Sequence, residues 1–92
     1  MKRPPRRNQE LFDLAMSVVR HARSVHDETT AQAIHSALGG SFTASEVLGD
    51  IRSAFVACRP RLDDRYPEEM RKQVAQAIVE IDRAFRRVNQ AR

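Results

Sequence analysis

The segment from Thr43 to Cys58, TASEVLGDIRSAFVAC, constrains this fold most, because it predicts one helix with two different packing faces. At 100° per residue, the large apolar side chains gather on one side of that helix. Small residues recur every four positions on another side, at Ser45, Gly49, Ser53 and Ala57. Because other helices can pack against either face, we expect this helix to lie in the middle of a helical assembly.

The ends of this helix carry clear local signals. Thr43 followed by Glu46 is a capping box, in which side chains at the start of a helix satisfy unpaired backbone N–H groups. At the other end, Pro60 disfavours the helical conformation of Arg59. The sequence therefore predicts a helix over residues 43–58.

Three further helices follow from the spacing of apolar residues, at 10–26, 29–38 and 67–90. Only 5% of the residues are aromatic and none is Trp, so the core must be mainly aliphatic. The sequence predicts one compact all-α domain of four helices over residues 10–92, preceded by an extended arm over residues 1–9.

The predicted ends of these helices rest on caps and helix breakers. Asn8 is the expected cap of the first helix, and Thr29 with Gln32 forms a second capping box. Gly39 or Gly40 is expected to adopt the left-handed conformation that ends the short second helix. Pro67 suits the first position of the last helix, where its missing N–H costs nothing.

The first predicted helix has an unusually wide apolar arc, because Phe12, Met16 and Val19 extend its main stripe. Two interpretations account for this width. Either the helix packs against two neighbours in its own chain, or these three side chains contact another molecule.

Positive charge is concentrated at the N-terminus. The net charge is +4, and the arm alone carries Lys2, Arg3, Arg6 and Arg7 without an acid. Such an arm can lie along nucleic-acid phosphates or can be a solvated tail. The last helix adds Arg83, Arg86 and Arg87, although Glu68–Lys72 and Asp82–Arg86 are spaced for ion pairs within the helix.

Residues 31–58 resemble a DNA-binding helix-turn-helix, because a short helix is followed by a glycine-containing turn and a capped second helix. The outer face of that second helix, however, presents Glu46 and Asp50 and no base. Acids facing a groove would repel phosphates. The pattern therefore argues against a recognition helix at this position.

No arrangement of residues predicts catalysis, a metal site, a cofactor or a small-molecule substrate. His21 and His26 are five residues apart and so do not share a helix face, and His21 is expected to be solvated. Cys58 falls on the apolar face of its helix, which indicates a buried, unreactive thiol. A single cysteine, no signal-peptide pattern and no long apolar run predict a cytoplasmic protein that does not enter membranes.

Two hypotheses for function remain. The first is a non-enzymatic regulatory protein, of the adaptor or inhibitor type, that binds a protein partner or a second copy of itself. Its candidate interface residues are Phe12, Met16, Val19, Ser45, Gly49, Ser53 and Ala57. The second is a nucleic-acid-binding regulator. Its candidate residues are Lys2, Arg3, Arg6, Arg7, Arg83, Arg86 and Arg87.

Overall fold

The computed structural model describes residues 8–40 and 43–90, with the side chains of 87–90 outside that description. Over these residues the chain forms four α-helices, one short 3₁₀ turn and no strand. The elements are α1 (Asn8–Ser24), α2 (Glu28–Gly39), α3 (Ala44–Cys58), η1 (Arg59–Arg61) and α4 (Glu68–Gln90). The predicted all-α fold is confirmed.

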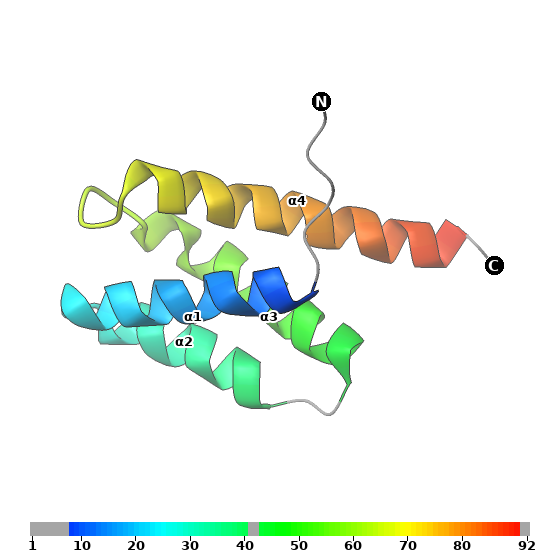
Figure 1. Ribbon diagram of the computed structural model, residues 1–92, viewed down its shortest axis with the longest axis horizontal. Coiled ribbons are helices and arrows are strands. Elements are labelled where there is room, and N and C mark those ends of the chain that lie inside the picture. Colours follow the sequence, from blue (N-terminus) through cyan, green and yellow to red (C-terminus); the bar gives the residue numbers. More distant parts are fainter. Residues whose placement is uncertain (1–7, 41–42, 91–92) are drawn as a thin grey trace.

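The helices alternate in direction along the bundle, as Figure 1 shows. α3 packs against α2 and α4 and also touches α1, so the predicted central position of this helix is confirmed. α1 likewise contacts each of the other three helices. The C-terminal end of α4 extends past the other helices in the view of Figure 1.

The core is mainly aliphatic, and every helix contributes to it. Among its completely or almost completely buried side chains are Val18, Val19, Ile34, Ile51, Phe55, Val74 and Ile81. Burial of each such side chain stabilises the fold by roughly 1.5–3 kcal/mol. Tyr66 from the connector before α4 is also buried, with only 1% of its surface exposed.

The width of the apolar arc on α1 is explained within the chain. Val19 is completely buried and Phe12 packs half-buried against the core, whereas Met16 remains 37% exposed. The arc is wide because α1 contacts three helices of its own chain. Val19 therefore does not belong to any surface that a partner reaches, and its prediction as an interface residue is wrong.

The start of α1 differs from the expectation. Asn8 is already helical, so it does not cap the helix from outside, and the predicted arm of residues 1–9 is too long by two residues. The rest of that arm, residues 1–7, lies outside the described residues.

In the turn between α1 and α2, the structure differs from two predictions. The cap of α2 is Asp27 rather than Thr29: its Oδ1 accepts from the backbone N–H of Thr30 at 3.3 Å. The residue with left-handed backbone is His26, with φ of 60°, and no described glycine has a positive φ. The backbone N–H of Asp27 donates to the carbonyl of Ala22 at 2.8 Å, which completes a Schellman ending of α1.

The predicted start of α3 is confirmed. Thr43 caps the helix, because the backbone N–H of Glu46 donates to its Oγ1 at 3.2 Å, and the two side chains bond at 3.1 Å. At the other end the chain tightens into η1 around Pro60 instead of leaving the helix at once. Pro67 lies just before α4, and its carbonyl accepts from the N–H of Arg71 at 3.1 Å.

Candidate interaction surface on α3 and α4

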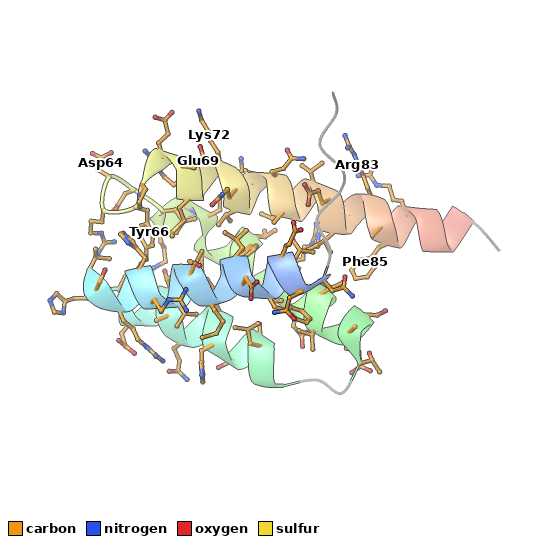
Figure 2. All side chains as sticks on the ribbon, in the orientation of Figure 1. Asp64, Tyr66, Glu69, Lys72, Arg83 and Phe85 are labelled. Carbon is orange, nitrogen blue, oxygen red and sulfur yellow. The ribbon has the colours of Figure 1, made fainter. Side chains whose placement is uncertain are left out.

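The crossing of α3 and α4 is fixed by one aromatic contact and one ion pair. A Cβ built on Gly49 would lie 3.8 Å from the ring of Phe85, so the small residue of α3 faces an aromatic side chain of α4. Figure 2 shows Phe85 pointing from α4 back toward the bundle. Further along, the Arg52 guanidinium binds both carboxylate oxygens of Asp82, partly shielded from solvent.

Two large apolar side chains are exposed beside this ion pair. Val56 lies one turn beyond Arg52 on α3 and is 45% exposed, and Val79 lies one turn before Asp82 on α4 and is 41% exposed. Figure 1 shows that α3 and α4 run in opposite directions. Val56 follows Arg52 in α3 and Val79 precedes Asp82 in α4, so both valines are displaced from the ion pair toward the same end of the two helices. We call Ser53, Val56, Ala57 and Val79 the α3–α4 surface, since all four are exposed.

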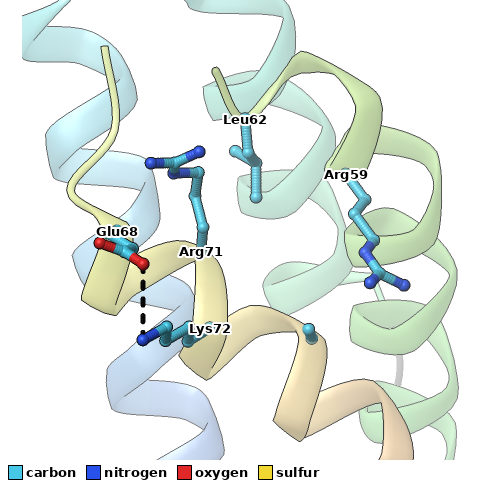
Figure 3. Close-up of a pocket in the computed structure, with 6 residues that line it drawn as sticks. Arg59, Leu62, Glu68, Arg71 and Lys72 are labelled. Atoms are coloured by element: carbon cyan, nitrogen blue, oxygen red, sulfur yellow. Dashed lines mark ion pairs between the residues drawn. The ribbon is translucent and has the colours of Figure 1, made fainter. Parts of the chain in front are cut away.

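A pocket lies between η1 and the start of α4. The pocket has a volume of about 340 Å³. Its lining residues are Arg59, Leu62, Glu68, Arg71, Lys72 and Ala75. Figure 3 shows Arg71 and Leu62 between the Glu68–Lys72 pair on one side and Arg59 on the other. We call this the basic pocket, because three cations line it against a single acid.

The charges of the basic pocket are only partly balanced. Lys72 Nζ lies 3.5 Å from Glu68, as the sequence spacing predicted. Arg59 and Arg71 form no ion pair within the described part of the chain, and Arg71 Nε is buried without a hydrogen-bond partner. A buried N–H without an acceptor is energetically costly. The Nε of Arg71 is itself without accessible surface, and Figure 3 shows the guanidinium groups of Arg71 and Arg59 on opposite sides of Leu62.

The other predicted interface residues are spread over two regions. Ser45, Ser53 and Ala57 are exposed on α3, while Gly49 between them is partly covered by Phe85. Met16 is exposed on α1, away from this ridge in the sequence and on another element. The predicted interface residues thus lie on two different helices, α1 and α3.

The candidate nucleic-acid residues are described only in part. Lys2, Arg3, Arg6 and Arg7 lie outside the described residues, as does the side chain of Arg87. Arg83 and Arg86 are exposed on α4, and Figure 2 shows Arg83 and Lys72 pointing away from the bundle. Asp82 binds Arg52 on α3, so the expected pairing of Asp82 with Arg86 is wrong.

A buried polar cluster, centred on Asp27, ties the α1–α2 turn to the connector before α4. Asp27 is 2% exposed, accepts from Tyr66 Oη at 2.7 Å and from Arg61 Nη2 at 3.1 Å. His21 Nε2 donates to the backbone carbonyl of Arg65 at 2.6 Å, and its ring lies 5.1 Å from that of Tyr66. The expectation of a solvated His21 is therefore wrong.

Ionisation in this cluster follows from its hydrogen bonds. Burial opposes the charge on Asp27, but bonds from Thr30, Tyr66 and Arg61 hold the pKa of its carboxyl well below the usual range. Burial and the bond to Asp27 raise the pKa of Tyr66 to about 12. Burial also raises the pKa of the Cys58 thiol, whose residue is 4% exposed, as the apolar face of α3 predicted.

The cluster does not resemble a reaction centre. Its carboxylate is fully engaged, its phenol is protonated near neutral pH and its cysteine is a buried thiol. Among the residues that the structure describes, no three His, Cys, Asp or Glu side chains are grouped to hold a metal ion. We therefore interpret the cluster as structural.

Comparison with protein-family models, with curated proteins and with solved structures finds no match to this chain. No helix in the described part of the chain is long and apolar enough to span a membrane.

Proposed function

We propose that this protein is a non-enzymatic regulator, of the adaptor or inhibitor type, that binds a protein partner through the α3–α4 surface. The observation that carries this proposal is the exposure of Val56 and Val79 on adjacent helices. Ser53 and Ala57 beside them present almost no side chain, so a partner helix can approach α3 closely. Exposed apolar groups grouped in this way are typical of protein interfaces.

A photo-reactive amino acid placed at Val56 in the full chain tests this proposal. In extract from the source cells, we expect one specific cross-linked partner, identified by mass spectrometry, or a cross-linked dimer of this chain. Val79→Glu should remove the product, because a charge would be buried in the interface. The same probe at Gln32, which is exposed on α2, is the matched control.

Sedimentation velocity separates the two kinds of partner. A dimer that Val79→Glu converts to monomer identifies a second copy as the partner. A monomeric chain whose Val56 probe yields no more product than the Gln32 probe would contradict the proposed surface.

The nucleic-acid alternative has one structural observation in its favour, the exposure of Arg83 and Arg86 on α4. Fluorescence anisotropy with labelled DNA and RNA at low salt tests it. If it holds, affinity should fall steeply as salt increases, and Arg83→Gln with Arg86→Gln should reduce both the affinity and the salt dependence. Absence of binding by the intact chain would exclude it.

A further inference from the structure

We propose that the partner is a second copy of this chain, and that the two copies pack their α3–α4 surfaces about a two-fold axis parallel to these helices. This step rests on the proposed function and specifies the partner. In such a dimer α3 of each copy lies on α4 of the other. An interface of this kind requires a face that is complementary to itself.

The exposed side of α3 is acidic toward the start of the helix and small toward its end. Four exposed residues follow one another at spacings of four, three and four positions. Residues at these spacings share one face of a helix. We call them the α3 stripe: Glu46, Asp50, Ser53 and Ala57.

The exposed side of α4 is apolar at its centre and basic toward its end. Val79, Arg83 and Arg86 are exposed and follow at spacings of four and three positions, so they also share one face. We call these three residues the α4 stripe. Figure 2 shows Arg83 pointing away from the bundle. Asp82, the acid at helical spacing from Arg86, binds Arg52 on α3, so the α4 stripe carries two positive charges.

Both stripes lie on the same side of the α3–α4 pair. α3 turns Gly49 and Arg52 toward α4. In return, α4 turns Phe85 and Asp82 toward α3. At 100° per residue, each stripe is about a quarter turn from these contacts, on the side away from the buried residues of its helix. The pair therefore presents one face that is acidic on α3 and basic on α4.

The contacts within the chain also fix which parts of the two stripes stand at the same level. Gly49 is level with Phe85, and the helices run in opposite directions (Figure 1). Asp50 is therefore level with Arg83 to within about one residue. A two-fold axis parallel to the helices preserves this level, so it places Asp50 of each copy on Arg83 of the other.

The same axis matches the rest of the two stripes. Glu46 of one copy comes within about two residues of the level of Arg86 in the other. Val79 falls between the levels of Ser53 and Ala57, whose small side chains leave room for it. Every contact occurs twice, so acids meet arginines at both sides of an apolar centre.

Charge complementarity selects this occupant and this axis. An axis perpendicular to the helices would lay α3 on α3 and α4 on α4, and neither stripe contains the opposite charge. A nucleic-acid backbone on this face would meet the acids Glu46 and Asp50. Opposite charges on adjoining helices at one level instead fit a second copy of the same face.

Charge reversal followed by mixing tests the dimer in the full chain. Sedimentation velocity at low salt should show a parent dimer with a dissociation constant on the order of micromolar. Asp50→Arg and Arg83→Asp should each weaken it by at least about tenfold, since each creates two like-charge contacts. An equal mixture of the two variants should restore the dimer, because the mixed dimer has opposite charges at both contacts.

Two features keep this experiment decisive. Both positions are exposed, and mixing cannot restore a chain that fails to fold, so recovery of the dimer reports a contact between copies. Asp13→Arg, which reverses an exposed acid on α1, is the matched control and should leave the dimer unchanged.

Three results would overturn the inference. The first is a parent chain that stays monomeric at about 100 µM, roughly a hundred times the expected dissociation constant. The others are a dimer that neither reversal weakens and a mixture that remains monomeric. None of them decides the proposed function, because the Val56 probe can still capture a different protein from cell extract. In that outcome the α3–α4 surface stands and the second copy is excluded.

Discussion

Asp27 holds three separate segments together through one carboxylate. It caps α2 through the N–H of Thr30, accepts the hydroxyl of Tyr66, and pairs with Arg61 from η1. A buried charge is tolerated only where several donors replace the water it has lost. Asp27 has those donors, and they come from both sides of the bundle end.

Asp27→Asn should lower the free energy of unfolding by about 3 kcal/mol, because the amide cannot replace the charge-assisted bonds to Tyr66 and Arg61. Urea denaturation at pH 7 measures this loss. Asp63→Asn is the control, since Asp63 is exposed and its carboxylate accepts from its near neighbour Arg65. An equal effect of both changes would contradict the role of the Asp27 cluster.

The low pKa of Asp27 predicts how stability depends on pH. The folded-state pKa lies below the unfolded value of about 3.9, so the stabilisation is complete above that value. It should be lost progressively as the pH falls from about 5 toward the folded-state pKa. The difference in unfolding free energy between the parent and Asp27→Asn should shrink over this range in denaturation series at several pH values.

His26 occupies a left-handed position that glycine adopts without strain. His26→Gly should therefore raise the free energy of unfolding by up to about 1 kcal/mol. His35→Gly, in the exposed middle of α2, should lower it by about 1 kcal/mol, because glycine weakens a helix interior. Thermal unfolding of the two variants side by side shows whether the effects have opposite signs.

At the scale of the elements, the sequence predicted those features that depend on residues close together in the chain. The helix periods and the Thr43 capping box involve residues within a few positions, so their chemistry is visible in the chain. The Asp27 cluster was missed because its partners Arg61 and Tyr66 lie 34 and 39 residues away. Arg52–Asp82 was missed for the same reason, since Asp82 has a nearer arginine at the usual helical spacing.

In the candidate surface too, some features depend on residues close in the sequence and others on contacts between distant residues. The exposure of Ser53 and Ala57 follows from the helical wheel of α3. The partial burial of Gly49, in contrast, depends on the position of Phe85 on α4. The sequence analysis assigned no binding role to Arg59 or Arg71, because nothing local indicates that η1 and α4 enclose a pocket. Only the fold brings these two arginines to one space.

The α3–α4 crossing leaves room for one methyl group at Gly49. A Cβ there would make ordinary van der Waals contact with Phe85 at 3.8 Å, and alanine favours the helix. Gly49→Ala should raise the free energy of unfolding by about 1 kcal/mol. A loss of stability in chemical denaturation would mean that α3 and α4 approach each other more closely than this distance.

At the scale of the whole molecule, Cys58 reports opening of the core. Its thiol is buried and its pKa is raised. In the folded state a reagent therefore rarely reaches the thiol, and little of the thiol is ionised. Modification by a thiol reagent should be slow in native buffer. It should accelerate in Asp27→Asn by about tenfold for each 1.4 kcal/mol of unfolding free energy that the variant loses. Fast labelling of the folded parent chain would contradict the packing of α3 described above.

The bond between Asp27 and Tyr66 also turns the chain between them into a closed ring that contains α2 and α3. The α1–α2 pair meets across a short turn, whereas ring closure requires ends 39 residues apart to meet. We therefore expect refolding to begin in the helix pair and to finish with closure of the ring. In that order of assembly, Asp27→Asn speeds unfolding far more than it slows refolding.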